Sequence, residues 1–469
     1  MESAPKRKRV LIVGGGISGL ATAWFLRRSG RYAVELFEGA PTPGGCVQTK
    51  IVDGFLVEEG PNGFLVNQAS VWNLVSDLGL QGELIPGSSL AGKNRFLLKD
   101  GKLLKLPSSL VGFLTNPVLS LFGRLRVLAE PLMARQKRLA GSAEFPDESI
   151  RDFSLRRLGR EATETLLDPF VSGIHAGDPA RISAPSGFPR LKNLETAFGS
   201  LFWGLIRGGL GAPKLDRSVA DPSRSRLWSL QGGLSQLVRA LSEKVDRLHL
   251  GRPVLEVAPC PSSSWRLSTE EGEFTGDHLV MAAPPAVAGR LLAPSVSEAS
   301  QVCQAMTSNS LVMVALGFAR DQVRHPLDGF GYLVPASEKR SHLGVQWCST
   351  IYPGRAPQGK VLLRVLLGGA RRPDLARMSP AELEKLALDE IRPILQIHGN
   401  PSMSHVRIWN PAIPQYELGH AQLVARLADI ESRWRTLFFT GNGLEGVSLN
   451  DCVAQAQRCA SRIERADGA

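Results

Sequence analysis

The residues best spaced for chemistry are a glycine-rich segment near the start of the chain and an acidic residue about twenty positions later. The segment is Gly14-Gly15-Gly16-Ile17-Ser18-Gly19, a G-x-G-x-x-G pattern, and the acid is Glu38. In this pattern the first glycine allows a tight turn, the second lets the backbone approach a pyrophosphate, and the third lets a helix pack on a strand. The carboxylate can accept hydrogen bonds from both ribose hydroxyls. The spacing predicts a dinucleotide-binding site, and the alternative is a glycine turn without a ligand.

The flanking sequence supplies the strand–helix–strand unit that such a site requires. Residues 10–13 are a β-branched, apolar run typical of a buried parallel strand, and residues 20–26 are apolar and compatible with a helix. Residues 33–37 form a second strand-like run that ends at Glu38. A helix beginning directly after the glycines would point its free N–H groups at the phosphates. We therefore expect a doubly wound α/β domain.

Two later glycine-containing segments indicate which dinucleotide is bound. Gly44-Gly45-Cys46 begins six residues after Glu38, and Gly60-Pro61-Asn62-Gly63 follows. A glycine pair at this distance resembles the FAD-containing amine oxidase superfamily, which also holds carotenoid desaturases and porphyrinogen oxidases. In that superfamily the pair lies along the FAD diphosphate. The amine oxidase and desaturase branches usually carry Arg after the pair, so Cys46 points toward the porphyrinogen oxidase branch.

Composition favours an ordinary globular protein without a metal. The 469 residues are 43% hydrophobic and 21% charged, and this length allows two or three domains. The six cysteines form no C-x-x-C and the eight histidines are scattered, so we expect reduced, mostly buried thiols and no metal. The basic leader at residues 6–9 is not followed by a secretory apolar region, so no secretory signal is expected.

The net charge of +11 is concentrated in residues 93–138, which hold ten basic and two acidic residues. The middle of this segment, residues 106–123, is apolar and uncharged, but Pro107 and Pro117 argue against a membrane-spanning helix. Two interpretations remain open. The segment lies in a membrane interface beside anionic lipid, or it is an amphipathic core helix with a solvated basic rim. Nucleic-acid binding is not expected, because no binding motif accompanies the cations.

The region after this segment is predicted to be helical over residues 147–195. A helix should begin near Ser149 and stop at Gly159. Residues 168–179 are predicted to form a glycine-punctuated loop, in which His175 is a candidate for a catalytic base. Residues 198–206 are a possible second interfacial patch, and residues 211–226 are predicted to be a loop.

The second half of the chain alternates between sheet and flavin-domain patterns. A glycine pair at 232–233 opens a helix over residues 234–244, residues 277–284 contain a strand, and residues 311–367 contain alternating strands followed by a helix over 380–391. Residues 437–465 predict a strand, a glycine turn and a helix whose N-terminal dipole would stabilise negative charge on a reduced flavin. Because no cysteine lies in a covalent-flavin context there, we expect non-covalent FAD.

Several segments together resemble the oxygen-dependent protoporphyrinogen oxidase family almost from end to end. They are the amino-terminal glycine motif and residues 94–96, 330–335, 413–416, 419–420 and 445–452. The resemblance implies an FAD-binding domain in three segments (1–86, 230–290 and 415–469). It also implies a mixed-sheet substrate domain in three segments (87–95, 196–229 and 291–414) and a helical membrane-associated domain (96–195).

The resemblance also implies the site residues. Those for FAD are Gly14, Gly15, Gly16, Ile17, Ser18, Gly19, Glu38, Gly44, Gly45, Cys46, Gly60, Pro61, Asn62, Gly63, Val254 against the adenine, Trp409, Gly441, Gly446, Val447 and Ser448. Those for the substrate are the propionate anchor Arg95, Gly173 near the flavin ring, and Leu333, Gln346 and Leu366 in an apolar slot. Lys93 and Arg364 are further cations whose distance from this slot the sequence leaves open.

The implied reaction explains why no acid–base pair is evident. A pyrrole nitrogen of a porphyrinogen can drive hydride transfer from a methylene bridge to the flavin, so the protein need only orient the ring and shield the site. Dioxygen then reoxidises the flavin and gives hydrogen peroxide. We expect protoporphyrinogen IX in preference to coproporphyrinogen III, because Arg95 is the one cation assigned to the slot.

Other activities and the cellular setting stay open at this stage. The alternatives are a polyamine or carotenoid oxidase of the same superfamily and a flavoprotein without enzymatic activity. We expect a cytoplasmic protein that is peripherally associated with the inner face of the cell membrane, with a homodimer as one option for its assembly.

Overall fold

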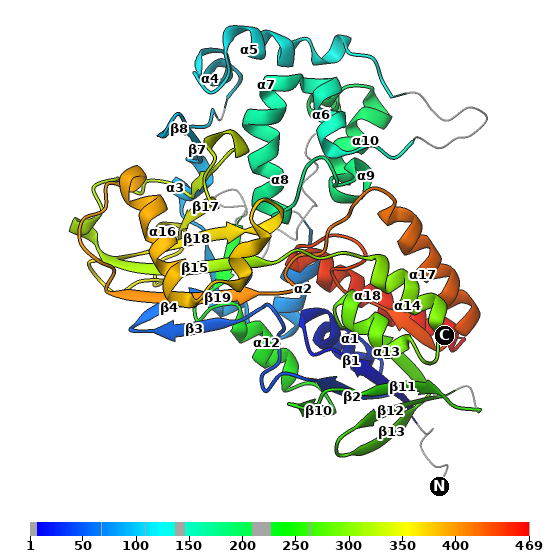
Figure 1. Cartoon of the computed structure of the whole chain (residues 1–469). Helices are drawn as coiled ribbons and strands as arrows, with labels where there is room; N and C mark the ends of the chain where they lie inside the picture. The colour runs from blue at the N-terminus through cyan, green and yellow to red at the C-terminus, as the bar shows by residue number, and fades with distance from the viewer. Residues whose placement is uncertain are drawn as a thin grey trace.

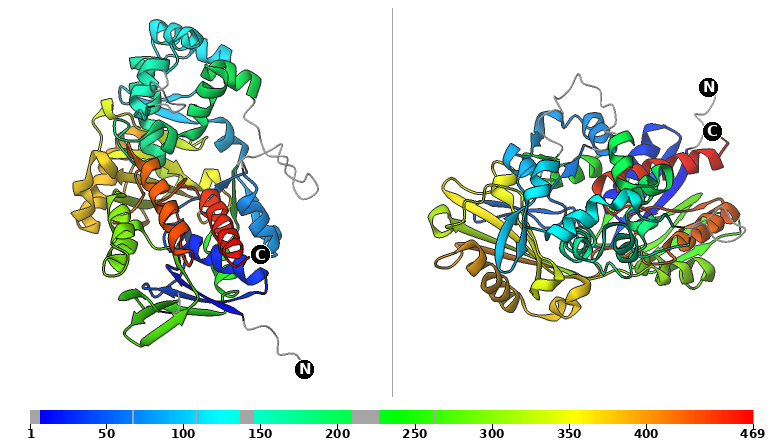
Figure 2. Two further views of the ribbon diagram at one scale, coloured as in Figure 1. Left: turned by 90° about the vertical axis from the view of Figure 1, so that its right-hand side faces the viewer. Right: turned by 90° about the horizontal axis from the view of Figure 1, so that it is seen from above.

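The computed structural model describes residues 7–66, 68–107, 109–136, 146–208, 227–261 and 264–468. Residues 1–6, the predicted loop at 211–226, Lys137 and Arg138 lie outside these ranges. The described chain has three parts (Figures 1 and 2). A sheet that contains β1 is covered by helices, a second sheet that contains β15 lies beside it, and a helical region that contains α5 lies at the end of the molecule away from the two chain termini.

The first sheet is parallel throughout and has five strands. In spatial order they are β10 (Arg247–Leu250), β2 (Tyr32–Glu38), β1 (Lys8–Val13), β14 (His278–Met281) and β20 (Leu437–Phe439). Val10 and Ile12 pack into one apolar cluster, whereas Leu11 and Val13 pack into another. Both faces are therefore buried, which explains the continuous apolar run in the sequence.

Helices cover both faces of this sheet. The cluster around Val10 includes side chains of α1 (Ile17–Arg28), α2 (Ser70–Asp77), α12 (Ser235–Ser242) and α18 (Leu449–Ala466). The cluster around Leu11 includes side chains of α13 (Pro285–Leu292), α14 (Ser297–Ala305) and α17 (His420–Trp434), together with an antiparallel sheet of β11 (Glu256–Pro259), β12 (Trp265–Thr269) and β13 (Gly272–Gly276). The predicted doubly wound α/β arrangement is confirmed.

The second large sheet is mixed and has seven strands. Their order is β19 (Met403–Trp409), β15 (Leu311–Ala319), β18 (Lys360–Gly368), β17 (His342–Trp347), β16 (Gly331–Leu333), β7 (Phe96–Lys99) and β8 (Lys102–Lys105). One face is buried under α16 (Pro380–Leu395), where Val345, Val365 and Leu383 share one core. The opposite face carries the alternate residues of each strand. This second face holds the candidate substrate residues.

Smaller elements join the two sheets. They are the hairpin of β3 (Thr49–Val52) and β4 (Phe55–Glu58), the sheet of β5 (Phe64–Leu65), β9 (Leu227–Leu230) and β6 (Leu84–Pro86), the helices α3 (Ser89–Lys93) and α15 (Cys348–Ile351), and the 3₁₀ turns η1 (Gln81–Glu83), η4 (Arg320–Gln322), η5 (Ala336–Glu338), η6 (Gly369–Arg371) and η7 (Pro373–Arg377).

The helical region consists of short helices. They are α4 (Leu110–Thr115), α5 (Leu121–Leu128), the 3₁₀ turn η2 (Glu130–Leu132), α6 (Ile150–Leu158), α7 (Arg160–Ala162), the π-helical turn η3 (Thr163–Leu167), α8 (Asp168–His175), α9 (Ala184–Gly187), α10 (Pro189–Phe198) and α11 (Leu201–Gly208). The predicted start and stop of the first long helix are confirmed. The Ser149 hydroxyl accepts a hydrogen bond from the Asp152 N–H, and Gly159 ends the helix with φ 87°.

The predicted loop at residues 168–179 is wrong over its first part, because residues 168–175 form helix α8. Pro169 stands in the first turn of α8, where a proline removes no helical hydrogen bond. The loop begins only at Ala176, which ends the helix in the left-handed conformation with φ 48°.

The helical region differs from the predicted range of 96–195 at both ends. It begins after β8 instead of at residue 96, because Phe96 and Leu98 lie in the core of the seven-stranded sheet. It also includes α11, which the prediction gave to the substrate domain, because Leu201 packs with Phe153 and Leu167. The other predicted boundaries stay predictions.

A cluster of buried ion pairs holds this helical region together. Arg157 is fully buried and pairs with Glu130, whose carboxylate also accepts hydrogen bonds from the Leu201 and Phe202 N–H groups at the start of α11. Glu195 pairs with Arg156 and Lys192 nearby. Burial raises the pKa of Glu195, but its hydrogen bonds and charge interactions with Arg156 and Lys192 outweigh burial and lower that pKa to about 2.

The lowered pKa predicts a specific sensitivity to acid. Because the folded-state pKa of Glu195 lies below its unfolded value, its stabilisation is complete above about pH 5 and is lost as the pH falls toward 2. Glu195→Gln should lower the free energy of unfolding at pH 7 by roughly 3 kcal/mol, and the difference from wild type should shrink on acidification. Urea unfolding at several pH values measures both.

The exposed pair Arg160–Glu164 provides the matched control. Glu164→Gln should change the free energy of unfolding by less than about 1 kcal/mol at every pH. A constant difference between Glu195→Gln and wild type from pH 7 to pH 2 would contradict the assignment.

Candidate active site

The predicted glycine motif forms the turn between β1 and α1. A Cβ on Gly14 would lie 2.7 Å from the carbonyl carbon of Ala282, and one on Gly19 would lie 2.0 Å from the carbonyl oxygen of Gly14. Both positions therefore require glycine. Gly16 differs, because a Cβ there would meet no atom within 4 Å. The space in front of Gly16 is thus open, and Gly16 caps α1 without any side chain bonded to the free N–H groups.

Glu38 stands at the end of β2, directly beside this turn. Its carboxylate accepts hydrogen bonds from the Gly15 N–H at 2.7 Å and from the Ala40 N–H at 2.8 Å. Pro253, which precedes the predicted adenine contact Val254, lies 3.5 Å from a Cβ built on Gly39. The acid and the predicted adenine contact therefore lie on one side of the glycine motif.

The two later glycine segments pack against the first. The Gly44 N–H donates to the Gly15 carbonyl at 2.8 Å, and Gly44 forms a β-bridge with Gly16. A Cβ on Gly60 would lie 1.8 Å from the carbonyl oxygen of Cys46, which immediately follows Gly45. This close approach brings the segment with Gly60, Pro61, Asn62 and Gly63 beside the predicted diphosphate site.

Trp409 and Tyr352 fix the other side of the Gly60 segment. The Trp409 indole N–H donates to the Glu59 carbonyl at 2.9 Å, and a Cβ on Gly63 would lie 2.0 Å from the Tyr352 hydroxyl. Trp409 therefore contacts the backbone just before Gly60, beside the predicted FAD site.

The carboxyl-terminal motif forms the turn between β20 and α18. Gly441 has φ 124° and Gly446 has φ 71°. The Ser448 hydroxyl accepts a hydrogen bond from the Asp451 N–H and donates to its carboxylate, so α18 begins with a capping box next to Val447.

Two residues that carried the resemblance hold this turn in place. The Tyr416 hydroxyl donates to the Asn442 carbonyl, and His420 Nε2 lies 2.8 Å from the Leu444 carbonyl. Their rings are stacked with centroids 4.3 Å apart. The family resemblance includes both residues but implies no role for them, because a positioning contact has no local sequence pattern.

The residues predicted to bind FAD thus converge at one edge of the five-stranded sheet. Gly14 follows β1, Glu38 ends β2 and Gly441 follows β20, so all three stand at the carboxyl ends of parallel strands. Ligands of open α/β sheets bind at this edge. The open space before Gly16, at the N-terminal end of α1, suits a dinucleotide diphosphate. The N-terminal end of α18 suits a reduced flavin.

The predicted substrate residues lie together on the outer face of the seven-stranded sheet. Leu333 pairs with Gly344, which pairs with Leu366, and in the adjacent row Gln346 pairs with Gly331 and Arg364. Gly173 of α8 lies over them, because a Cβ there would be 2.8 Å from a methyl carbon of Leu333. The structure therefore brings Gly173, Leu333, Gln346 and Leu366 into one site, which we call the sheet slot.

Arg95 and Arg364 are the two arginines associated with the sheet slot. Arg95 is exposed just before β7, with its guanidinium 5.7 Å from the Phe330 ring centroid, and no acid of the described chain lies within ion-pair distance of it. Arg364 is buried and shares its row with Gln346. Burial lowers the pKa of Arg364, but a guanidinium stays charged at neutral pH.

His175 is only a weak base in this structure. It is buried between the rings of Phe188 and Tyr416, and burial lowers its pKa to about 4. The imidazole is therefore neutral at physiological pH. The backbone carbonyl of His175 accepts hydrogen bonds from the Asn309 and Gln415 side chains, and these contacts fix the end of α8.

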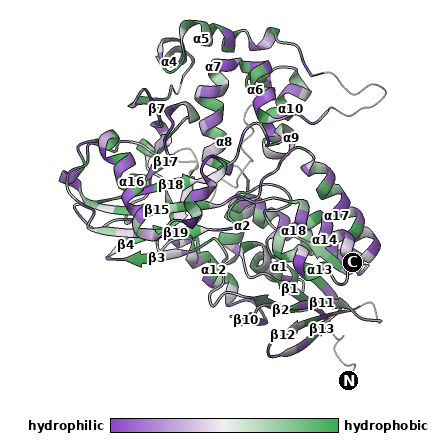
Figure 3. Cartoon of the chain, viewed as in Figure 1, coloured by the Kyte–Doolittle hydropathy of each residue, from purple (hydrophilic) through white to green (hydrophobic). Residues whose placement is uncertain are grey.

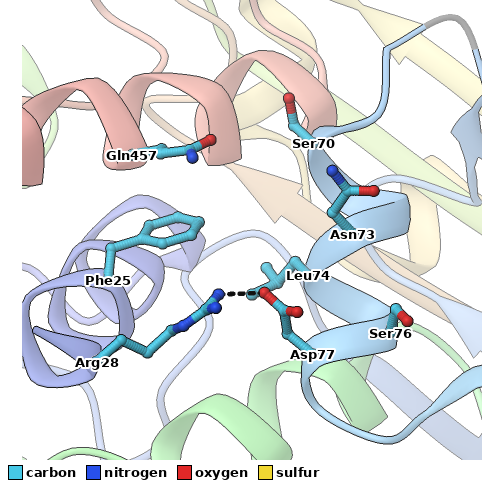
Figure 4. Close-up of a pocket in the computed structure, with 8 residues that line it drawn as sticks. All are labelled: Phe25, Arg28, Ser70, Asn73, Leu74, Ser76, Asp77 and Gln457. Atoms are coloured by element: carbon cyan, nitrogen blue, oxygen red, sulfur yellow. Dashed lines mark hydrogen bonds and ion pairs between the residues drawn. The ribbon is translucent and has the colours of Figure 1, made fainter.

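Two pockets lie outside the sheet slot. One of about 280 Å³ is lined by Phe25 and Arg28 of α1, residues of α2 and Gln457 of α18, and it holds the Arg28–Asp77 ion pair (Figure 4). It lies at the last turn of α1, away from Gly16. The other, of about 440 Å³, is lined partly by Thr42 and Pro43, beside the Gly44 pair.

A family model described as flavin-containing amine oxidoreductase matches residues 17–464. This chain belongs to that family. A protoporphyrinogen oxidase from Bos taurus is 33% identical over 487 residues and a coproporphyrinogen III oxidase from Bacillus subtilis is 29% identical over 474 residues. The aligned regions cover 97% of this chain and 98% and 97% of those proteins, respectively.

Solved structures agree with this assignment. A protein of Exiguobacterium sp. 255-15 assigned as a protoporphyrinogen oxidase matches with a TM-score of 0.82 at 25% identity, covering 98% of this chain and 100% of that one. A putrescine oxidase matches with a TM-score of 0.70 at 16% identity over 98% of this chain and 99% of that one, which shows a shared fold. The predicted family, flavin cofactor and oxidoreductase class are confirmed.

Non-covalent attachment of the flavin is a separate prediction. The described segments around Gly14, Gly44 and Gly446 would hold the cofactor through backbone groups and helix ends, which form no covalent bond to it. Acid precipitation of the yellow protein should leave all of the flavin in the supernatant as FAD, measured by absorbance and chromatography. Flavin that remains with the precipitated chain would contradict this prediction.

Proposed function

We propose that this enzyme oxidises protoporphyrinogen IX to protoporphyrin IX in haem biosynthesis, with FAD as cofactor and O2 as electron acceptor giving H2O2. The observation that carries the proposal is the sheet slot. It combines the apolar side chains Leu333 and Leu366 under Gly173 with an exposed guanidinium, Arg95, at its margin. A flat macrocycle with carboxylates on one side requires this combination. The full-length relatives support the same activity.

The chain's own residues act by binding and orientation. Leu333 and Leu366 exclude water from the methylene bridge, Gly173 lets α8 approach the Leu333 side chain closely, and Arg95 pairs with a propionate. When bound, FAD supplies the hydride acceptor. The pyrrole nitrogens of the porphyrinogen provide the electronic drive, so a neutral His175 is compatible with the reaction.

Steady-state kinetics with two porphyrinogens tests this proposal. The wild-type enzyme should convert protoporphyrinogen IX to fluorescent porphyrin, consume O2 and release H2O2, with a higher kcat/KM than for coproporphyrinogen III. A preference of tenfold or more for the four-propionate compound would mean that the assignment of the slot is wrong.

Coproporphyrinogen III is the second candidate substrate, and one observation favours it. Arg364 adds a second guanidinium to the sheet slot. The similarity to the Bacillus subtilis coproporphyrinogen III oxidase is also in its favour.

We further propose that the helical region binds an anionic membrane surface, which would make the enzyme a peripheral protein on the inner face of the cell membrane.

No helix in the described ranges is long and apolar enough to span a membrane. The apolar segment at residues 106–123, for which one amphipathic core helix was the alternative to a membrane interface, contains α4 and the start of α5, two short helices separated at Asn116 and Pro117. Apolar residues lie on both helices at the outer end of the molecule (Figure 3). The exposed apolar residues here are Leu114, Leu121, Phe122, Leu125 and Leu132, with Trp203, Leu205 and Ile206 on α11.

Binding to anionic vesicles tests the membrane proposal. Phe122 is 82% exposed, and inserting its ring into the interface is worth about 1.5–3 kcal/mol. Phe122→Asp should therefore weaken co-sedimentation with anionic vesicles roughly tenfold or more. Raising the salt concentration should weaken the wild type only partly, because screening acts on the cations alone.

Ile51→Asp on β3 is the matched control, because Ile51 is 77% exposed but lies on the β3–β4 hairpin, outside the helical region. Its vesicle binding should equal that of the wild type. Equal binding of the wild type to neutral and anionic vesicles would contradict the proposal.

The predicted homodimer stays a prediction.

A further inference from the structure

Arg364 is a buried cation without an anionic partner in the substrate face of the seven-stranded sheet. Its side chain is 6% exposed. One guanidinium nitrogen donates to the Gly60 carbonyl, another lies 3.4 Å from Gln346 Oε1, and Nε has no hydrogen-bond acceptor. No carboxylate within the described ranges comes within 4 Å of it. A buried charge left in this state is costly, so the site is incomplete without an anion.

Glu58, the carboxylate that interacts with Arg364, does not fill this role. Glu58 interacts with Arg364 at longer range, but its carboxylate is occupied. It accepts hydrogen bonds from the Leu234 N–H at 2.9 Å and the Thr49 hydroxyl at 2.7 Å, and Arg355 lies 3.6 Å away. The two groups that accept hydrogen bonds from Arg364, the Gly60 carbonyl and the Gln346 side chain, are neutral. An uncharged donor would satisfy them equally well.

The strand register places Arg364 and Arg95 at opposite ends of one row. Arg364 pairs with Gln346, Gln346 pairs with Gly331, and Arg95 precedes Phe96, which pairs with Tyr332. Three strand spacings therefore separate the two arginines, which is about 14 Å between Cα atoms. Gln346 and Gly331 lie between them in this row, and the apolar residues Leu333 and Leu366 form the adjacent row on the same face.

We propose that Arg364 binds a substrate carboxylate on the side of the macrocycle opposite to the carboxylate held by Arg95, and that this residue lets the enzyme accept coproporphyrinogen III in addition to protoporphyrinogen IX. This inference rests on the proposed porphyrinogen oxidase function. The two propionates of protoporphyrinogen IX are on neighbouring rings and face one side. Coproporphyrinogen III carries one propionate on every ring, so it alone can engage both arginines at once.

Kinetics of Arg364 variants with the two substrates test this assignment. Arg364→Met keeps an unbranched stem and removes the guanidinium and its charge, whereas Arg364→Lys keeps the charge and loses the paired donor geometry. Arg364→Met should lower kcat/KM for coproporphyrinogen III at least tenfold more than for protoporphyrinogen IX, mainly through KM. Arg364→Lys should recover part of the difference. FAD content and the reduction potential of the bound flavin should stay at wild-type values.

Three results would overturn the assignment. Equal losses for the two substrates in either variant would mean that Arg364 only supports the Gly60 segment. A shifted flavin potential with an unchanged substrate ratio would mean that its anion is the reduced flavin. Wild-type enzyme that oxidises protoporphyrinogen IX but not coproporphyrinogen III would exclude the second carboxylate site even if Arg364→Met does not fold. Wild-type enzyme that oxidises neither porphyrinogen would instead refute the proposed function.

Discussion

Gly16→Val is expected to give a folded but colourless protein. A Cβ at this position meets no atom of the chain within 4 Å, so the substitution should not disturb the packing of α1 on β1. The same open space is where the phosphates would approach the backbone. Losing two charge-assisted hydrogen bonds to the diphosphate would cost about 3–6 kcal/mol, which corresponds to at least a hundredfold weaker FAD binding. Flavin absorbance per polypeptide and circular dichroism measure the two effects.

Gly82→Val provides the matched control for this experiment. A Cβ on Gly82 also meets no atom within 4 Å, but the residue lies in η1, away from the glycine motif. Its flavin content should equal that of the wild type. A Gly16→Val protein that purifies with a full complement of FAD would contradict the position of the diphosphate.

Arg95→Ala is expected to weaken substrate binding without changing the cofactor. The guanidinium is exposed and has no acid partner in the described structure, so no stabilising ion pair is lost on substitution. The loss of a charge-assisted hydrogen bond to a propionate should raise KM by about ten- to a hundredfold, equivalent to about 1.5–3 kcal/mol. Steady-state kinetics with protoporphyrinogen IX and the flavin content of the variant check both parts.

The control for Arg95 is Lys385→Ala. Lys385 is an exposed cation on α16, which covers the opposite face of the same sheet. It should leave KM unchanged. If Arg95→Ala also leaves both KM and kcat unchanged, Arg95 has no part in substrate binding.

The flavin-binding part of the fold was predictable because its geometry is written in local sequence. Gly14, Gly19 and Glu38 act within one strand–helix–strand unit, and their roles depend on the absence of a Cβ or on the end of a strand. The capped helix start at Ser149 was equally local. Residues such as Leu333 and Leu366 came from the family resemblance instead, since an apolar residue in a strand does not show which face it occupies.

The parts that sequence reasoning missed depend on contacts between distant segments. Helix α8 was assigned to a loop because glycine is usually a helix breaker, but a larger residue at position 173 would meet the side chain of Leu333. The two halves of residues 106–123 form separate helices because Pro117 interrupts them. The position of Arg364 beside Gln346 follows from strand register, which the sequence leaves open.

The central claim is that a porphyrinogen reduces the flavin directly, and anaerobic mixing tests it most directly. When the yellow holoenzyme is mixed with protoporphyrinogen IX without oxygen, the flavin absorption should be lost and porphyrin absorption should appear in the same reaction. Admitting O2 should restore the oxidised flavin spectrum. Flavin that stays oxidised with porphyrinogens but is bleached by a polyamine or a carotenoid precursor would contradict the account and assign the enzyme to another branch of its family.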